Sequence, residues 1–278
     1  MSGRLTLDRL LIHLVLIGGG FVMLVPFFWL ISSSLKEPFN IYRFPPQWIP
    51  DPIQWQNYVE VFEAVNVWGY TANTLIITIF GTLGTVLSSS LAAYSFARLR
   101  FKGRDFVFGA ILSTVMLPFV VTMIPLYILF SRLGWIGTFL PLIVPEWFGG
   151  AITIFLLRQF FRTIPIELED AARIDGASRP RIFAFVILPL SRPALTVVTV
   201  LAFLNHWNDF LSPLIYLTKR DLYTLALGLN ALQYFEGGLD WTHYVMVLAT
   251  LMVLPVVLIY FLAQRALVEG IVLTGLKG

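Results

Sequence analysis

Six apolar segments, each long enough to cross a lipid bilayer, constrain this chain more than any other feature of its sequence. A helix of about 20 apolar residues spans the hydrocarbon core, because it satisfies its own backbone hydrogen bonds where no water is present. The chain has 58% hydrophobic and only 13% charged residues, whereas a soluble domain has about 25% charged residues. The six segments cover roughly residues 10–35, 73–97, 106–130, 141–161, 194–217 and 241–264. The sequence therefore predicts an all-α membrane protein with six transmembrane helices, in a single transmembrane domain over residues 1–278.

Positive charges between these segments favour one orientation. If both termini lie in the cytoplasm, 14 of the 19 Lys and Arg residues fall on the inner side and 5 on the outer side. Short inner loops of membrane proteins carry such an excess. The first apolar stretch is too long for a signal peptide and lacks a small-residue cleavage site, so we expect an uncleaved helix. We therefore expect a multi-pass protein of the inner membrane with cytoplasmic N- and C-termini, and with a periplasmic segment at 36–66 that holds one short helix at Asn57–Phe62.

Prolines and small residues predict irregular, closely packed spans. Prolines interrupt four of the six segments, where backbone groups must find other partners: Pro118 and Pro125, Pro145, Pro213 and Pro255. Small residues line the second segment, from Gly81 and Gly84 through Ser88–Ser90 to Ala92 and Ala93. Such residues let neighbouring helices approach closely.

Several classes of function are excluded by what the sequence lacks. It has no cysteine, which excludes disulfides and cysteine–metal sites. It has no G-x-x-x-x-G-K-[ST] phosphate loop, so ATP must be hydrolysed by another chain. Its positive residues form short patches rather than one basic face, which argues against nucleic-acid binding. No clustered His/Glu spacing suits a metal. We expect no catalytic residues, no bound metal and no cofactor on this chain.

The loop between the fourth and fifth segments, residues 164–193, is more patterned than a simple connection requires. Acidic residues at positions 167–170 suit the positive end of a helix, and Asp175-Gly176 is a turn signal. The small Ala171-Ala172 pair beside this turn is what a knob that fits a partner's cleft requires. From the residue pattern alone, a docking element and a plain amphipathic surface hairpin both remain open.

This loop resembles the EAA loop of permease subunits of ABC importers. Asp170-Ala171-Ala172, Asp175-Gly176-Ala177 and a later pair of prolines match the EAA pattern in order and spacing, with Asp170 in place of the glutamate. The resemblance implies that the loop couples the spans to an ATPase. The implied coupling residues are Glu169, Asp170, Ala171, Ala172, Asp175, Gly176, Ala177, Phe183, Pro189 and Pro193.

Two further stretches resemble the carbohydrate-uptake branch of these permeases, and are similar to the second permease subunit of the maltose importer. Phe203–Pro213 resembles the W-N-x-F…P stretch of that branch. The tail at residues 266–278 resembles its closing G-L-T-x-G-x-x-K-G pattern in part, because Gly270-Ile271-Val272 stands where the pattern has G-L-T.

The resemblance implies partners and a cargo. It implies a heterodimer with a second permease subunit, two ATP-binding subunits that use ATP and Mg, and surrounding membrane lipid. It also implies a periplasmic or lipid-anchored binding protein that delivers a sugar or oligosaccharide. The ATPase would drive alternating access through the EAA loop. Lys277 and Gly278 at the end of the tail would reach the ATPase subunits.

Polar residues in the fifth segment are candidates for lining the translocation path. An ionisable side chain inside a span suggests a function. His206 and Asp209 lie one helical turn apart, so they could also pair with each other. The candidates are Asn205, His206, Trp207, Asn208 and Asp209.

Charged residues near the other spans have simpler interpretations. For Glu146 in the fourth segment we prefer a place at the membrane interface to a role as a gate. For Arg98, Arg100, Lys102 and Arg104 we favour setting topology and contacting lipid phosphates, with a role beside the ATPase as the alternative.

Three rival functions remain. The first is the permease of an importer for glycerol phosphate or another small polar solute. The second is a membrane-embedded enzyme, which would need paired acidic residues at a membrane rim, whereas the close acidic group at 167–170 belongs to the EAA match. The third is a proton-coupled secondary carrier, for which His206 and Asp209 are the candidate proton carriers.

Overall fold

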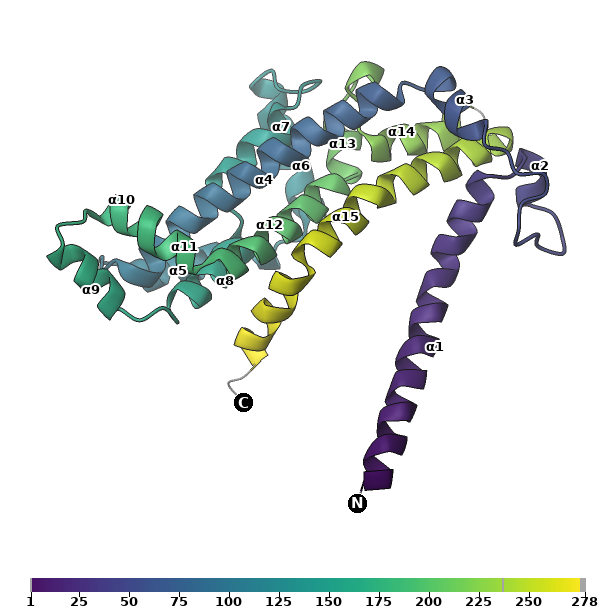
Figure 1. Ribbon diagram of the computed structural model, residues 1–278. Coiled ribbons are helices and arrows are strands. Elements are labelled where there is room, and N and C mark those ends of the chain that lie inside the picture. The colour runs from purple at the N-terminus through teal and green to yellow at the C-terminus, as the bar shows by residue number, and fades with distance from the viewer. Residues whose placement is uncertain (1, 237, 276–278) are drawn as a thin grey trace. The chain divides into compact units, whose positions relative to one another are not determined.

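The computed structural model describes residues 2–236 and 238–275, and all regular secondary structure in these ranges is helical. Four helical stretches are long and apolar enough to cross a membrane: Asp8–Ser34, Val67–Arg98, Leu140–Phe161 and Thr242–Leu267. Two bent helix pairs bring the number of candidate spans to six if each pair is counted as one. The chain divides into two compact units. Figure 1 labels their helices and colours them by residue number.

The first unit comprises Met1–Val67 and Gly228–Leu254. Its helices are α1 (Ser2–Ser34), α2 (Pro38–Ile41), α3 (Asn57–Ala64), η5 (Leu232–Glu236), η6 (Gly238–Trp241) and the beginning of α15 (Thr242–Gly275). The segment after α1 is ordered, because Asn57 Nδ2 donates hydrogen bonds of 2.9 Å to the carbonyl oxygens of both Ser34 and Lys36. The predicted short helix is confirmed as α3, whereas α2 is a second helix that the sequence pattern did not predict.

The second unit comprises Trp68–Leu227 and Pro255–Gly278. Its long helices are α4 (Val67–Arg98), α5 (Arg104–Ser113), α6 (Phe119–Arg132), α8 (Ala151–Phe161) and α12 (Arg192–Trp207). Its shorter elements are η1 (Thr114–Met116), α7 (Leu140–Ile143), η2 (Val144–Phe148), α9 (Glu167–Ile174), α10 (Arg179–Ile182), the π-helix η3 (Phe183–Ile187), α11 (Leu188–Leu190), α13 (Leu211–Tyr216) and η4 (Arg220–Leu222). The boundary between the two units falls within α14 (Leu225–Ala231).

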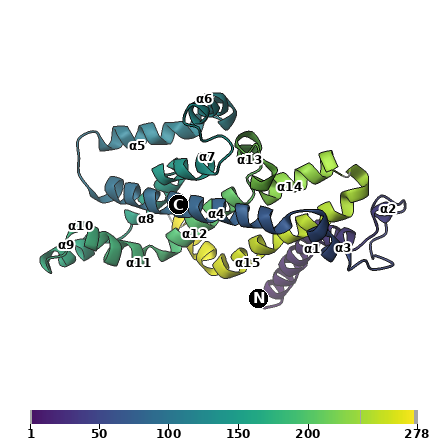
Figure 2. The ribbon, with the colours of Figure 1, turned by 90° about the horizontal axis from the view of Figure 1, so that it is seen from above.

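Three of the expected spans are not continuous helices. The third bends by 101° between η1 and α6, at Pro118, and Figure 2 accordingly shows α5 lengthwise and α6 nearly end-on. The fourth breaks between η2 and α8, where Gly149 has a φ of 89°. The fifth breaks after Trp207 and resumes at Leu211. By contrast, Pro125 and Pro255 lie inside α6 and α15, so breaks predicted there are wrong; such prolines are tolerated where neighbouring groups take over the freed carbonyl.

Two apolar clusters of the second unit lie on either side of a polar stretch of α4. One cluster contains Phe96, Phe161 and Ile182, and the other contains Ile77 and Tyr216. Between the two clusters, one face of α4 carries small and polar residues, among them Gly81, Thr85 and Ser88, whereas its other positions are large and apolar. Helix α8 packs against both α5 and α12. Figures 1 and 2 both show α9 and α10 beyond the C-terminal end of α4. This arrangement defines two places where function can reside: the α9–α10 hairpin and the polar stretch of α4.

Candidate functional site

The predicted coupling loop forms a hairpin in which α9 ends at a glycine turn. Gly176 has a φ of 81°, in the left-handed region that favours glycine. The Gly176 N–H donates to the carbonyl of Arg173 at 3.0 Å, and the Ala177 N–H donates to that of Ala172 at 2.9 Å. These two bonds are the pair that closes a helix in a Schellman motif. Asp175 and Gly176 therefore set the direction in which the chain leaves α9.

The inner face of the hairpin is tied to α4 by a buried ion pair. Arg98 Nε at the end of α4 lies 2.9 Å from Glu169 Oε1, and these side chains are 8% and 0% exposed. The Arg98 Nη2 group also donates to the carbonyl of Phe161 at 2.6 Å and to that of Ile164. Arg173 lies 3.6 Å from the other oxygen of Glu169. One guanidinium thus joins α4, the end of α8 and α9, where a cation also suits the negative end of α8.

The outer face of the hairpin exposes apolar side chains. Ile174 is 87% and Phe185 is 74% exposed, and Ala171 is also exposed. Between α9 and the following turns lies a cavity of about 290 Å³. It is lined by Ala172, Asp175, Ala177, Arg181, Phe185 and Val186. This face of the hairpin thus combines exposed apolar side chains with a shallow hollow.

The remaining predicted coupling residues lie along the same hairpin. Asp170 is exposed and pairs with Arg173 at 2.8 Å. Phe183 begins the π-helix and packs against Tyr94 of α4, with ring centroids 5.1 Å apart. Pro189 lies in α11, and Pro193 is the second residue of α12. Lys277 and Gly278 lie outside the described residues.

Arg98 makes buried contacts that sequence reasoning missed. It was predicted to contact lipid phosphates, yet it is half-buried as a residue and its side chain faces the protein. Its neighbours along the chain behave differently, because Arg100 and Lys102 are exposed. No local signal separates Arg98 from these residues, since its partners lie more than 60 residues away in the sequence.

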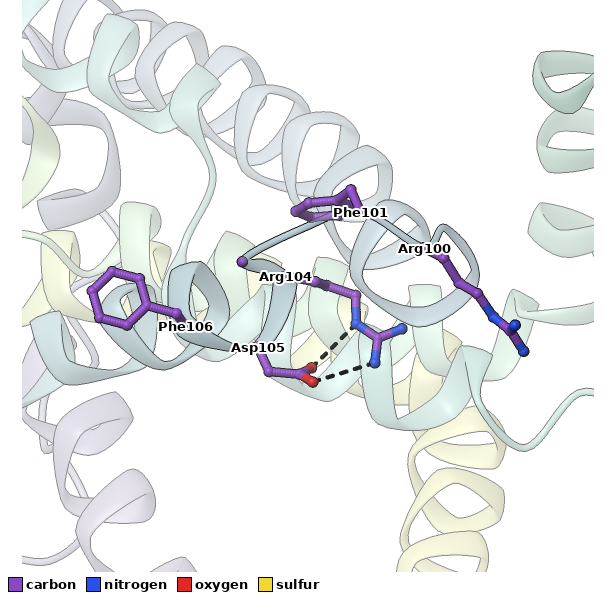
Figure 3. A pocket seen from close by; sticks show the side chains of 6 residues that line it. Arg100, Phe101, Arg104, Asp105 and Phe106 are labelled. Atoms are coloured by element: carbon purple, nitrogen blue, oxygen red, sulfur yellow. Dashed lines mark hydrogen bonds and ion pairs between the residues drawn. The ribbon is translucent and has the colours of Figure 1, made fainter.

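The basic turn between α4 and α5 carries a cavity of about 370 Å³. Figure 3 shows Arg104 reaching Asp105, with distances of 3.1 and 3.5 Å to its two oxygens, whereas Arg100 points away from this pair. Phe106 beside them is 82% exposed. Contacts of these cations with lipid phosphates remain a prediction.

A second cavity, of about 750 Å³, lies where α12 is broken, and we call it the acidic cavity. It is bordered by α4, α6, α7, η2 and α13 as well as by α12. Its polar lining residues are Glu146, Asn205, His206, Asn208, Asp209, Ser212 and Tyr216. Four of the five candidate path residues thus meet in one cavity. The fifth, Trp207, is buried at 2% exposure and stacks on Phe203.

Glu146 and His206 lie together in the acidic cavity. His206 Nε2 is 3.7 Å from Glu146 Oε2, and Thr85 Oγ1 donates a 2.8 Å hydrogen bond to the same carboxylate oxygen. Asp209 instead accepts a hydrogen bond from the backbone N–H of Ser212 at 3.2 Å. The two ionisable residues of the fifth segment are therefore not paired with each other. Glu146, for which a place at the membrane interface was preferred, points into the polar stretch of the unit.

Glycines of α4 make room for this arrangement. A Cβ atom on Gly81 would lie 3.0 Å from the His206 ring, and one on Gly84 would lie 2.6 Å from the Trp147 ring. Ser88 Oγ donates to the carbonyl of Glu146 at 3.3 Å, and Ser89 Oγ accepts a bond from the N–H of Gly150. The predicted close approach through small residues is therefore present along α4. Within the described residues no three His, Asp or Glu side chains group as metal ligands would.

Comparison with known proteins places this chain in context. The family model for "Binding-protein-dependent transport system inner membrane component" matches residues 84–272. An arabinooligosaccharide transport system permease protein of Halalkalibacterium halodurans is 34% identical over 93% of this chain and 92% of its own length. An sn-glycerol-3-phosphate transport system permease protein of Brucella abortus is 32% identical over 96% of this chain and 97% of its own length.

A solved structure shares the fold. It is a chain of a bacterial ABC transporter involved in the import of the acidic polysaccharide alginate, with a TM-score of 0.80 and 24% identity. The match covers 93% of the present chain and 96% of the other. The helical architecture described above is therefore that of an ABC transporter permease.

Proposed function

Because the chain belongs to the family of binding-protein-dependent transport system inner membrane components, and is thus a membrane-embedded transport permease rather than an enzyme, we propose that it carries a sugar or oligosaccharide and is driven through the α9–α10 hairpin. A separate ATPase subunit supplies the energy, using ATP and Mg. The cargo is proposed because relatives aligned over nearly the full chain are named for arabinooligosaccharides and other sugars.

The observation that carries the coupling proposal is the two-sided construction of the hairpin. Its inner face is joined to α4 and α8 by the buried Arg98–Glu169 pair, and its outer face exposes Ile174 and Phe185. A surface loop that only joined two helices would not need a buried charge pair on one face and uncovered apolar residues on the other. Movement of a partner seated on the outer face would pass through the inner face into the long helices.

The proposed topology has six spans. The bent pair Arg104–Met116 with Phe119–Arg132 counts as the third span, and α12 with α13 counts as the fifth, which leaves residues 164–193 in the cytoplasmic loop. Both termini lie in the cytoplasm, and residues 1–278 act as one transmembrane domain. The excess of Lys and Arg on the inner side supports this orientation. Alternating access would move these spans between inward- and outward-open states.

The proposed assembly has a second permease subunit, two ATP-binding subunits and a binding protein outside the membrane. The exposed outer face of the hairpin, Ala171 and Ile174 above all, suits the ATPase. The coupling residues are those of the EAA match, and Lys277 and Gly278 are proposed to reach the ATPase as well. Asn205, His206, Trp207, Asn208 and Asp209 are proposed to form or support the translocation path, together with Glu146.

The coupling proposal is tested by substituting Gly176, with Gly103 as a matched control. Both glycines are exposed, both have φ near 80°, and a Cβ on either meets no atom within 4 Å. A valine at either position costs about 1–3 kcal/mol of backbone strain, so the two variants are destabilised alike. We expect Gly176→Val to insert normally but to lose ATP-dependent uptake by at least about tenfold, equivalent to about 1.4 kcal/mol. Gly103→Val should retain uptake.

Unchanged uptake in Gly176→Val would contradict the coupling role. Equal loss in both variants would point to general destabilisation or to a role of the basic turn beside the ATPase. Purification of the chain without any ATPase subunit, together with uptake that needs no ATP, would contradict the importer assignment as a whole.

Glycerol phosphate is the second candidate cargo, because the Brucella relative named for it covers nearly the whole chain. Uptake by the reconstituted importer, measured with sn-glycerol-3-phosphate and with neutral trisaccharides in parallel, separates the two candidates.

A further inference from the structure

The acidic cavity has the size and lining of a ligand site. Its volume of about 750 Å³ lies within the range of about 300–1,000 Å³ found for small-molecule pockets. Aromatic side chains from α6 and α13, among them Phe119, Phe130 and Tyr216, line it beside the polar groups of α12. Flat apolar rings next to hydrogen-bonding groups suit a molecule with both C–H faces and hydroxyl groups.

Tyr216 combines a buried hydroxyl with a firmly held ring. Its side chain is 2% exposed, and its hydroxyl has no hydrogen-bond partner among the described residues. The ring is held in place, because it stacks on Tyr127 at 6.4 Å and meets the edge of Phe130 at 5.3 Å. An unpaired buried hydroxyl is unfavourable and rare in folded proteins, unless a ligand or water completes it.

The charges that line the cavity are acidic. Glu146 and Asp209 contribute carboxylates, His206 stands beside Glu146, and no Lys or Arg is among the lining side chains. Thr85 Oγ1 donates a hydrogen bond to Glu146, which holds this side chain at the cavity. In a cleft between low-dielectric walls such charges repel anions over the whole opening.

We propose that the acidic cavity binds an uncharged polyhydroxyl unit of the cargo and rejects anionic units, an inference that rests on the proposed function. Asn208 and Asp209 hydrogen-bond the unit, and the aromatic rings pack against its C–H faces. The cavity thereby acts as a selectivity site within this subunit, and it disfavours phosphorylated or uronic-acid cargo.

The test uses the absence of cysteine from the native chain. Asn205→Cys places a single thiol in the exposed part of the cavity lining. The full chain, tagged and kept in membranes with its partner subunits, is treated with a cationic thiol reagent (methanethiosulfonate ethyltrimethylammonium) or an anionic one (methanethiosulfonate ethylsulfonate). Each rate is divided by the rate of the same reagent with a free small thiol.

An acidic cavity should make the cationic reagent react at least about tenfold faster than the anionic one, as focused charge raises local counter-ion concentration by that order. In the matched control, Asn205→Cys with Glu146→Gln and Asp209→Asn, the two rates should become similar. The single addition of Asp209→Asn should give an intermediate ratio, which keeps the test interpretable if the Glu146 variant inserts poorly.

Protection identifies the ligand class. Millimolar maltotriose or arabinotriose should slow labelling of Asn205→Cys, whereas trigalacturonate and sn-glycerol-3-phosphate should not. A labelling-rate ratio near one, or a ratio that neutralisation of the carboxylates leaves unchanged, would overturn the proposal. It would also be overturned if an anionic probe or the cation spermidine slowed labelling, or if neither neutral sugar did. Failure of the proposed coupling function would be seen in a different experiment, as unchanged ATP-dependent uptake in Gly176→Val.

Discussion

Arg98 is the residue on which three segments of the second unit converge. Its guanidinium faces a carboxylate from α9 and two backbone carbonyls at the end of α8. Both charged side chains are removed from water, so each depends on the other for its electrostatic stabilisation. The pair therefore holds α9 against the end of α4.

Loss of Arg98 should destabilise the chain strongly. Arg98→Met leaves the buried Glu169 with only the half-exposed Arg173 as a partner, and loss of a buried ion-pair partner costs about 3–5 kcal/mol. We expect a clear drop in unfolding temperature in detergent, whereas the exposed control Lys102→Ala should change stability by less than about 0.5 kcal/mol. The double variant Arg98→Met with Glu169→Leu removes both charges and should recover most of the loss. A double variant as unstable as the single one would show that the ion pair is not the cause.

The residue scale also marks the limit of sequence reasoning. Asp175 and Gly176 were recognised because turn chemistry is local: a positive φ after a helix needs glycine. The same reasoning failed for Arg98 and preferred the membrane interface for Glu146, because each is defined by partners about 60 or more residues away. Tyr216 was missed for the same reason, since an unpaired hydroxyl is a property of its surroundings.

At the scale of elements, α4 is the helix against which the others are arranged. Its glycines leave room for the rings of Trp147 and His206. Its serines form hydrogen bonds with the backbone of Glu146 and Gly150, just before α8. A helix with large side chains at these positions would hold its neighbours farther away.

Substitution of glycine should have opposite effects on α4 and α5. In Gly84→Ala the new Cβ would lie 2.6–2.9 Å from the Trp147 ring, so the ring must shift, at a cost of about 1–3 kcal/mol. In Gly109→Ala, inside α5, nothing lies within 4 Å, so better helix propensity should stabilise the protein by up to about 1 kcal/mol. Thermal unfolding of both variants checks the signs. Equal effects would mean that α4 and η2 do not approach as closely as described.

The sequence predicted where the apolar segments lie better than it predicted where their helices break. Length and hydropathy predicted six segments, of which four are found as helical stretches long and apolar enough to span a membrane, and the family model confirms the resemblance that the EAA loop suggested. The breaks were harder to predict, because proline marks a place where a helix is weakened but not whether it bends. Pro118 stands at a 101° bend, whereas Pro125, seven residues later, lies inside a helix. Pro118 has the extended backbone of a residue just before a helix, with a ψ of 141°, whereas Pro125 continues α6.

At the scale of the whole molecule, Lys36 links folding to pH. It lies just after the first candidate span and is 1% exposed, with its ammonium 3.9 Å from the Trp29 ring centre. Burial lowers the pKa of Lys36 below its ordinary value of 10.5. The unfolded chain therefore binds this proton more readily than the folded chain does. Protonation of Lys36 therefore lowers the free energy of unfolding, and this free energy increases as pH rises from the lowered pKa towards 10.5.

A comparison with Lys36→Met isolates this contribution. The stability of the native chain relative to the variant should increase with pH in that window, with a slope of at most about 1.4 kcal/mol per pH unit, the limit for one proton. Unfolding curves of both chains between neutral and alkaline pH measure it. A difference that is independent of pH, or that falls as pH rises, would show that Lys36 is not held as described.

The two faces of the hairpin differ in one further respect, which is direction. Ion pairs and hydrogen bonds, such as those of Arg98, hold only over a narrow range of angles, so α9 cannot turn relative to α4 without breaking them. Apolar contacts, such as those that Ile174 and Phe185 can make, depend on area and hardly on angle. The inner face of the hairpin is thus fixed in orientation relative to α4, whereas contacts at its outer face would leave the angle to a partner free. A partner could push or pull it through an arc and transmit displacement throughout, without having to hold it at one angle.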